Sequence, residues 1–245
     1  MNRPAVISAL IVAAGKSARM GAQTDKLFLP VAGRPLVAHA WQRFDTAPLI
    51  DEIILVVREG RQNAFADLAA RYRFAKPFRF ALGGKERQDS VWNGLESLSP
   101  RSEIVAIQDA ARPCTSLALI EATIAAARQE GAAVAAQPVS DTIKLSEDGV
   151  HVSHHLDRSR LWSVQTPQTF RVEVIRRALT AMRERGLHFT DDTAACELIG
   201  HPVKLVFVPA PNPKVTVPGD VPYVEMLLKS AQKCNASVTA GKSGA

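Results

Sequence analysis

The sequence predicts an α/β fold built on a mostly parallel sheet, and three observations support this class. Short runs rich in branched apolar residues alternate with longer stretches in which apolar residues recur at helical spacing. Glycine, proline and aspartate gather just after several predicted strands, where open α/β sheets bind their ligands. A chain of 245 residues, 47% of them hydrophobic, is long enough to bury one large core.

The predicted strands and helices alternate along the chain. We expect strands at 6–12, 52–57, 79–82, 103–108, 132–136 and 203–208. We expect helices at 35–44, 63–72, 87–98, 117–130, 172–185 and 221–232. Because a helix separates each strand from the next, the fold should be a Rossmann-like, mostly parallel sheet flanked by helices.

The periodicity changes at about residues 141–158, which should form a protruding β-hairpin arm. Two short strands at 142–145 and 150–154 flank a turn at 146–149. A lone hairpin is marginally stable unless it packs on something, so the arm should have a partner. His151, His154 and His155 carry metal-binding groups, but strand alternation would place His154 on the opposite face from the other two, and we predict no metal site.

The composition indicates an ordinary globular protein that binds anions. Thirty Lys and Arg against 24 Asp and Glu give a formal net charge of +6 and a pI near 9.5. Aromatic residues make up only 6% and there is no dense basic run, so no nucleic-acid partner is expected. With no apolar run long enough for a membrane span and no signal-peptide pattern, we expect a cytoplasmic protein with no membrane partner.

The domain organisation is expected to be simple. No internal repeat or linker interrupts residues 1–234, which should form a single domain, and the small, polar stretch 235–245 should be disordered. Cys114, Cys196 and Cys234 have spacings that suit neither a disulfide framework nor a zinc site, so they should be reduced thiols.

The segment 9–21, followed by Lys26, has the pattern of a phosphate-binding loop. An apolar strand ends in Ala13-Ala14-Gly15, small residues that allow phosphate oxygens close to backbone N–H groups, while Arg19 and Lys26 supply positive charge. A P-loop is excluded because its first glycine position is occupied by Leu10, and the dinucleotide fingerprint also fails. The remaining interpretations are another type of nucleotide loop or a flexible surface turn.

Five further segments make the chain resemble the 2-C-methyl-D-erythritol 4-phosphate cytidylyltransferase family. Together with the first loop they cover roughly residues 6 to 230. They are Gly83-Gly84-Lys85-Glu86-Arg87-Gln88-Asp89-Ser90-Val91, Asp109-Ala110-Ala111-Arg112-Pro113, Asp141-Thr142-Ile143-Lys144, Gln165-Thr166-Pro167-Gln168 and Pro213-Lys214-Val215-Thr216.

The resemblance implies an enzyme that joins CTP to 2-C-methyl-D-erythritol 4-phosphate and releases pyrophosphate. Its catalytic cations would be Arg19, Lys26 and Lys214, the residue types that stabilise charge on a transferring phosphorus. Mg²⁺ would be bound mainly through the CTP phosphates. The implied CTP-binding residues are Ala13, Ala14, Gly15, Arg19, Lys26, Gly84, Ser90, Asp109 and Ala110.

The second substrate, a polyol phosphate, would be bound by another set of residues. In the resembling family the arm reaches across a homodimer, and we expect the same here. The implied set is Asp109, Arg112, Thr142, Arg158 and Thr166. Asp109 would hold ribose, a substrate hydroxyl or magnesium, or instead cap the next segment.

Two positions depart from common forms of the family's motifs. Lys85 stands where some relatives carry an acidic residue, which puts a side-chain role in base reading in doubt. Gln108 replaces a histidine found before Asp109 in many relatives.

Several alternatives remain open from the sequence. Asp191-Asp192 resembles a catalytic carboxylate pair, but we interpret Thr190 as a helix N-cap with acidic first-turn residues. The chain could instead be a cytidylyltransferase for ribitol 5-phosphate, or a nucleotide-binding regulator without turnover. The three cations Arg19, Lys26 and Lys214 argue against the regulator.

Overall fold

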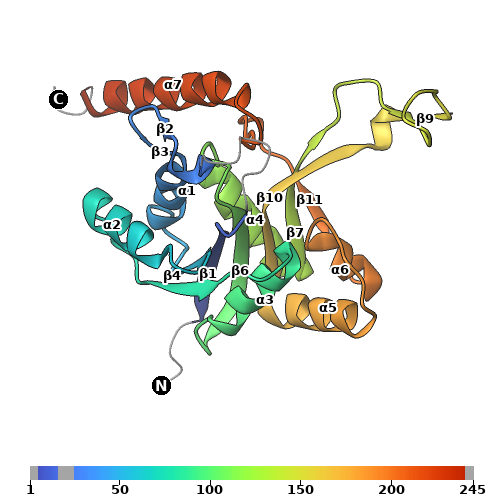
Figure 1. The fold of residues 1–245 in the computed structure, drawn as a ribbon, viewed down its shortest axis with the longest axis horizontal. Coiled ribbons are helices and arrows are strands. Elements are labelled where there is room, and N and C mark those ends of the chain that lie inside the picture. Colours follow the sequence, from blue (N-terminus) through green and yellow to red (C-terminus); the bar gives the residue numbers. More distant parts are fainter. Residues whose placement is uncertain (1–4, 16–24, 241–245) are drawn as a thin grey trace.

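The computed structural model describes residues 5–15 and 25–240, with side chains to 232. Its centre is a seven-stranded sheet in the order β11-β7-β10-β6-β1-β4-β5 (Figure 1). The strands are β1 (Val6–Val12), β4 (Glu52–Val57), β5 (Phe78–Leu82), β6 (Ser102–Asp109), β7 (Ala132–Pro138), β10 (Trp162–Arg171) and β11 (Lys204–Val206). β10 runs antiparallel to its neighbours β6 and β7, and all other pairs are parallel.

Helices cover both faces of this sheet. One face packs against α1 (Leu36–Asp45), α2 (Gln62–Tyr72), α4 (Leu117–Glu130) and α7 (Asp220–Ala240). The other packs against α3 (Arg87–Glu96), α5 (Val172–Glu184) and α6 (Thr193–Leu198). Along β1, Ile11 faces the first cluster and Leu10 the second, and both are fully buried, as expected of a strand covered on both faces.

The predicted fold class is confirmed, and each of the six expected strands and six expected helices is present. Of the larger elements, β10 and α6 were not predicted. β10 contains Pro167, a residue that argues against a central strand because it has no N–H to donate. The structure accommodates it at an irregularity, where the pairing with β7 shifts register between Val164 and Gln168.

The second missed element, α6, also corrects the interpretation of Thr190. α6 begins at Thr193, so Thr190 is not its N-cap. The Asp191 carboxylate instead accepts hydrogen bonds from the Thr193 hydroxyl (2.7 Å) and the Ala194 N–H (3.0 Å). The Asp192 side chain is buried and forms an ion pair with Arg87.

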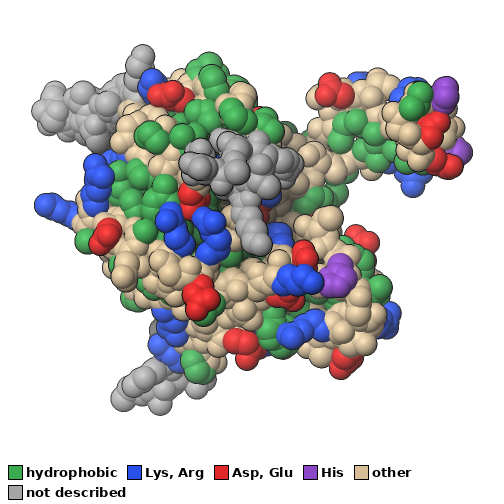
Figure 2. Space-filling model, in the orientation of Figure 1, with side chains coloured by type: hydrophobic (Ala, Val, Ile, Leu, Met, Phe, Trp, Pro, Cys, Tyr) green, Lys and Arg blue, Asp and Glu red, His purple; other side chains and the backbone are tan. Residues whose placement is uncertain are grey.

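The arm projects from the body as a separate feature (Figures 1 and 2). It contains β8 (Lys144–Leu145) and β9 (His154–His155), which pair antiparallel. The second strand is therefore shorter than predicted, and His151 lies outside it. The reason is that the Asp148 carboxylate accepts hydrogen bonds from the backbone N–H groups of Val150 and His151, each at 2.8 Å, which draws this stretch into a turn.

Three smaller segments complete the description. The 3-10 helices η2 (Lys26–Phe28) and η3 (Arg158–Arg160) and the hairpin β2 (Pro30–Val31) with β3 (Arg34–Pro35) connect the larger elements.

α7 extends to Ala240, so it includes 235–240 of the stretch expected to be disordered; residues 241–245 lie outside the described part. Within that part, no helix is both long and apolar enough to cross a membrane. Cys114 and Cys196 are free thiols.

Candidate active site

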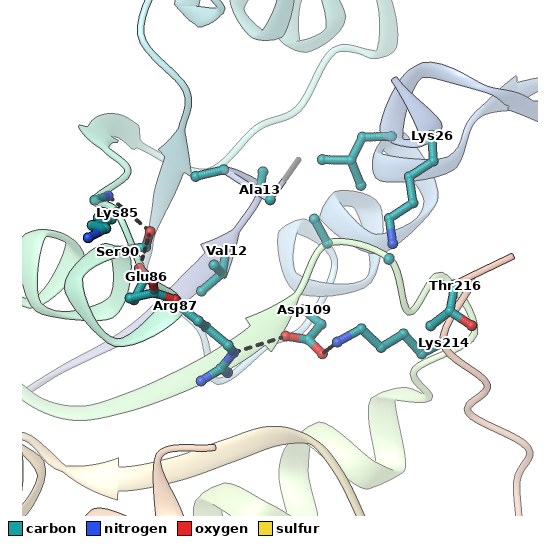
Figure 3. A pocket seen from close by; sticks show the side chains of 16 residues that line it. Val12, Ala13, Lys26, Lys85, Glu86, Arg87, Ser90, Asp109, Lys214 and Thr216 are labelled. Atoms are coloured by element: carbon teal, nitrogen blue, oxygen red, sulfur yellow. Dashed lines mark hydrogen bonds and ion pairs between the residues drawn. The ribbon is translucent and has the colours of Figure 1, made fainter. Parts of the chain in front are cut away.

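A cavity of about 450 Å³ lies at the carboxyl ends of β1 and β6, where the loop after β5 also meets them (Figure 3). Every predicted CTP-binding residue in the described part of the chain lines it. Arg19 lies in 16–24, outside the described residues. The lining consists of Val12, Ala13, Ala14, Gly15, Lys26, Leu27, Gly84, Lys85, Glu86, Arg87, Ser90, Asp109, Ala110, Ala111, Lys214 and Thr216.

The loop at Gly83-Gly84 packs so closely that neither position has room for a side chain. A Cβ on Gly83 would lie 2.3 Å from the Ala14 Cβ, and one on Gly84 would lie 2.2 Å from the Asp89 Cβ. Glycine at both positions therefore brings the backbone of this loop against the β1 loop and the start of α3. The capping box between Glu86 and Asp89 fixes where α3 begins.

The Ser90 hydroxyl is engaged with the same loop. It accepts a hydrogen bond from the Gly84 N–H (3.0 Å) and donates one to the Glu86 carbonyl (3.1 Å). Ser90 is buried at 3% exposure although it lines the cavity. In this structure Ser90 thus holds the loop in shape, and a contact between its hydroxyl and a base stays a prediction.

Two lysines from distant parts of the sequence enter the cavity. Lys26, on η2, donates a hydrogen bond from Nζ to the Val215 carbonyl (2.9 Å). Lys214 forms an ion pair with Asp109, with Nζ 2.7 Å from Oδ2. Figure 3 shows the Lys26 ammonium directed into the cavity and Lys214 extended to Asp109. The structure therefore joins Lys26 to the 213–216 motif, although Lys26 and Val215 are 189 positions apart in the sequence.

Asp109 is the central carboxylate of the site and is surrounded by cations. Its Oδ1 lies 3.5 Å from Arg87 Nε, while its Oδ2 faces Lys214 and lies 3.9 Å from Arg112 Nε. Burial raises the pKa of Asp109, but Arg87, Lys214 and Arg112 outweigh it and hold the pKa below its ordinary value. The carboxylate is therefore charged at neutral pH.

A smaller cavity of about 200 Å³ adjoins the first on the other side of Asp109. Asp109, Arg87 and Lys214 line both cavities. The predicted acceptor residues Arg112 and Thr166 line the smaller one, together with Val164, Gln165, Gln168, Thr190 and Asp191. The two cavities thus meet at one carboxylate and two cations, an arrangement suited to two anionic substrates that must approach each other.

Buried amides support the wall of the smaller cavity. Asn212 is 2% exposed; its Nδ2 donates to the Thr166 carbonyl (2.8 Å), and its backbone carbonyl accepts from Arg112 Nη1 (2.7 Å). Gln108, the departure from the histidine of many relatives, is fully buried and donates to the Asp109 carbonyl at 3.2 Å. The Gln108 side-chain amide therefore stabilises the turn that follows β6.

Thr142 and Arg158 are not brought to either cavity of this chain. Both lie on the arm and are exposed, and Arg158 Nη1 donates to the Ser140 carbonyl at 2.6 Å. The arm also exposes apolar side chains, with Leu145 at 45%, Val150 at 78% and Val152 at 65%. An isolated hairpin with such side chains lacks the packing that stabilises hairpins within one chain.

The described residues contain no group of three or more His, Cys, Asp or Glu side chains that could hold a metal ion. Asp109 is the carboxylate common to the two cavities, and its oxygens face Arg87, Lys214 and Arg112. Cations so close to a carboxylate compete with a divalent ion for its oxygens. The donor set therefore does not form a protein-only magnesium site.

Sequence reasoning missed two members of the site. Arg87 lies within the Gly83–Val91 motif but was given no role, and Asp192 was interpreted as a helix-dipole residue. The structure instead joins them, with Arg87 Nη1 2.8 Å from Asp192 Oδ2. Arg87 could have been singled out as the basic residue that begins the helix predicted after the glycine loop. Nothing in the sequence indicated that its partner lies 105 positions later.

Comparisons with known proteins agree with one another. Residues 7–230 match the family model described as 2-C-methyl-D-erythritol 4-phosphate cytidylyltransferase. A relative of that name from Alkaliphilus oremlandii is 40% identical over 92% of this chain and 96% of its own. One from Symbiobacterium thermophilum is 41% identical over 93% and 95%.

Solved structures give the same result. A crystal structure of 4-diphosphocytidyl-2C-methyl-D-erythritol synthase from Anaerococcus prevotii has a TM-score of 0.81 at 30% identity, covering 92% of this chain and 99% of that one. A 2-C-methyl-D-erythritol 4-phosphate cytidylyltransferase from Thermus thermophilus has a TM-score of 0.74 at 32% identity, covering 91% and 99%.

Proposed function

Because this chain belongs to the 2-C-methyl-D-erythritol 4-phosphate cytidylyltransferase family, we propose that it joins CTP and 2-C-methyl-D-erythritol 4-phosphate into 4-diphosphocytidyl-2-C-methyl-D-erythritol, releasing pyrophosphate. This is a nucleotidyl transfer in the non-mevalonate synthesis of isoprenoid precursors. The observation that carries the proposal is the pair of adjoining cavities that share Arg87, Asp109 and Lys214.

The chemical step needs charge stabilisation more than covalent help. An oxygen of the acceptor's phosphate attacks the α-phosphorus of CTP, a new P–O bond forms, and the bond to the β-phosphate oxygen breaks so that pyrophosphate leaves with the electron pair. Both reactants are anions. Lys26 and Lys214 both supply positive charge to the larger cavity, and Arg19 is proposed to act with them.

The nucleotide's base and ribose would occupy the larger cavity. The Gly83-Gly84 loop offers backbone groups at close range, because neither glycine has a side chain that would hold the base away. Main-chain donors and acceptors discriminate among bases because the wrong base leaves buried polar groups unpaired. Ala13, Ala14, Gly15 and Ala110 form the small-residue wall for the ribose and phosphates, with Asp109 beside the sugar.

Mg²⁺ is proposed to enter bound to the CTP phosphates, since in the described part of the chain no cluster of carboxylates offers a site for it. When bound, the ion neutralises part of the triphosphate charge. The protein then contributes cations and backbone donors around the phosphates.

The acceptor's phosphate is proposed to bind in the smaller cavity through Arg112 and Thr166, completed by Thr142 and Arg158 from the arm of a second copy. Arg112 is buried to 11% side-chain exposure at this cavity, whereas Arg158 is exposed on a projecting hairpin. A two-fold homodimer would cover the apolar side chains of the arm and bring Arg158 to the partner's site.

The reaction is tested by measuring pyrophosphate release with CTP and Mg²⁺. Release should require 2-C-methyl-D-erythritol 4-phosphate. Faster turnover with ribitol 5-phosphate would assign the chain to that acceptor instead, and CTP binding without turnover on either would support a regulator.

The shared site is tested by mixing two inactive variants, Arg158→Ala and Lys26→Ala. If Arg158 acts on the partner's site, a mixed dimer has one site with both lesions and one with neither. Random reassortment of equal amounts makes roughly half of the dimers mixed, so about a quarter of wild-type activity should return. No recovery, with subunit exchange confirmed by mass labelling, would rule out the shared site.

A further inference from the structure

Arg87 occupies a position between three separate segments of the chain. It is the first residue of α3, directly after the glycine loop of the larger cavity, and its side chain reaches Asp109 at the end of β6 and Asp192 just before α6. Figure 3 shows Arg87, Asp109 and Lys214 in one row along the floor of the cavity. The Arg87 side chain therefore links the nucleotide loop to the residues that form the smaller cavity.

The two oxygens of Asp109 have different cationic neighbours. Oδ1 faces Arg87 Nε at 3.5 Å, and Oδ2 faces Lys214 Nζ at 2.7 Å and Arg112 Nε at 3.9 Å. Without Arg87, both remaining cations would lie on the Oδ2 side and would pull the carboxylate toward them. Among the described residues, Arg87 is thus the cation that faces Oδ1 and opposes this pull.

Asp192 fixes the Arg87 guanidinium in this position. Its side chain is 1% exposed and accepts from Arg87 Nη1 at 2.8 Å, and its backbone N–H donates to Gln168 Oε1 at 2.9 Å. Burial raises the pKa of Asp192, and the Arg87 cation opposes that rise. A planar guanidinium can face two carboxylates at fixed angles, which a lysine ammonium cannot do.

We propose that Arg87, held by Asp192, is a positioning residue for the transfer reaction: it orients the Asp109 carboxylate that both substrate cavities share. The proposal rests on the proposed function above. Loss of Arg87 should then impair the use of CTP and of the acceptor together, because the shared wall of the two cavities changes.

The first test compares Arg87→Gln and Arg87→Lys with the wild-type full-length protein. Both variants should lower kcat/KM for each substrate by at least about tenfold while remaining folded at the assay temperature, as judged by circular dichroism. Arg87→Lys restores the charge and should not restore activity, because one ammonium cannot hold both carboxylates. Full activity in a folded Arg87→Gln, or rescue by Arg87→Lys, would overturn the proposal.

The matched control is Arg176→Gln. Arg176 also pairs with a carboxylate, that of Glu96, but lies outside both cavities. Its kcat/KM values should stay within about twofold of wild type. If Arg176→Gln lost as much activity as Arg87→Gln, the effect would be a general loss of ion pairing and the proposal would fail.

The second test asks whether Arg87 acts through Asp109. Adding Arg87→Gln to Asp109→Asn should lower kcat/KM by no more than about twofold beyond Asp109→Asn alone, whereas independent roles would multiply. Multiplying effects would overturn the positioning role and make Arg87 a substrate contact. If Arg87→Gln does not fold, Asp192→Asn replaces it in the cycle with the same expectation.

CTP affinity, measured by calorimetry without acceptor, separates this proposal from the proposed function. Wild type inactive on every acceptor would refute the function, and the Arg87 variants would still be expected to bind CTP at least about threefold more weakly. Wild type active, with unchanged CTP affinity and kcat/KM in the variants, would refute only the role of Arg87.

Discussion

Replacing Lys26 by methionine tests the proposed chemistry most directly. Methionine keeps most of the volume of the side chain and removes its charge. In the structure Lys26 lies on η2, lines the larger cavity and donates from Nζ to the Val215 carbonyl at 2.9 Å. The substitution therefore removes one cation from the proposed phosphate site and, with it, the hydrogen bond from Lys26 to the 213–216 segment.

The two losses differ in size. Removing a preorganised donor from a developing negative charge costs about 2.7–4 kcal/mol of transition-state stabilisation, so kcat/KM should fall by about 10²–10³. Losing one charged hydrogen bond costs about 1.5–3 kcal/mol of the free energy of unfolding. For a chain of this size that lowers Tm by roughly 3–12 °C, which leaves the protein folded at 25 °C.

The assay is steady-state pyrophosphate release at 25 °C, with Tm measured on the same samples. Lys229→Met serves as the control, because Lys229 forms a surface ion pair with Glu225 at 2.9 Å on α7. It should lose at most about 0.5 kcal/mol of stability and no activity. A folded Lys26→Met with kcat/KM within threefold of wild type would refute a transition-state role for Lys26.

Three further predictions follow from packing and from burial. Gly84→Ala would place a Cβ 2.2 Å from a Cβ of α3, so the KM for CTP should rise at least about tenfold; Gly219→Ala, which meets no atom within 4 Å, should leave it unchanged. Burial raises the pKa of the Cys114 and Cys196 thiols to about 11 and about 12, so neither should be alkylated readily at pH 8 in the native protein. Peptide mass spectrometry measures the labelling rate of each thiol. Labelling of the native protein as fast as that of the protein unfolded in guanidinium would contradict this prediction. Although burial raises the pKa of Asp109, the surrounding cations hold it below its ordinary value, so the carboxylate's stabilising contribution should be present at pH 6 and decline as pH falls below about 4; urea unfolding of wild type and Asp109→Asn should show their difference shrinking from pH 6 to pH 3.

The sequence could predict most of the fold because its strongest signals are local. Strands such as β1 are continuous apolar runs, and helices such as α4 carry regular apolar spacing between a Ser116 cap and Gly131. β10 was not predicted because Pro167 and several glutamines and threonines interrupt its apolar pattern. Its place in the sheet depends on pairing with β6 and β7, which is information the strand does not itself contain.

The candidate site could likewise be predicted only in part from the sequence. The loops at Gly15, Gly84 and Asp109 could be predicted to meet, because they all follow parallel strands. The ion pair between Arg87 and Asp192 could not, because it depends on how the segment between α5 and α6 packs against the start of α3, where Gln88 bonds to Leu187 and Phe189. From the sequence alone, a buried aspartate before a helix cannot be told from one that caps it.

β10 has a consequence for how enzymes of this design can diverge. The residues that line the larger cavity lie before position 115, except Lys214 and Thr216, whereas Thr142, Arg158, Thr166 and Thr190 all come after β7 begins. β10 leads from the arm into the sheet as one continuous strand and carries Thr166 of this second set. Acceptor choice can therefore change through the chain after position 132 while the loops of the larger cavity are kept, provided that Arg87, Asp109, Arg112 and Lys214, which also line the smaller cavity, are kept with them.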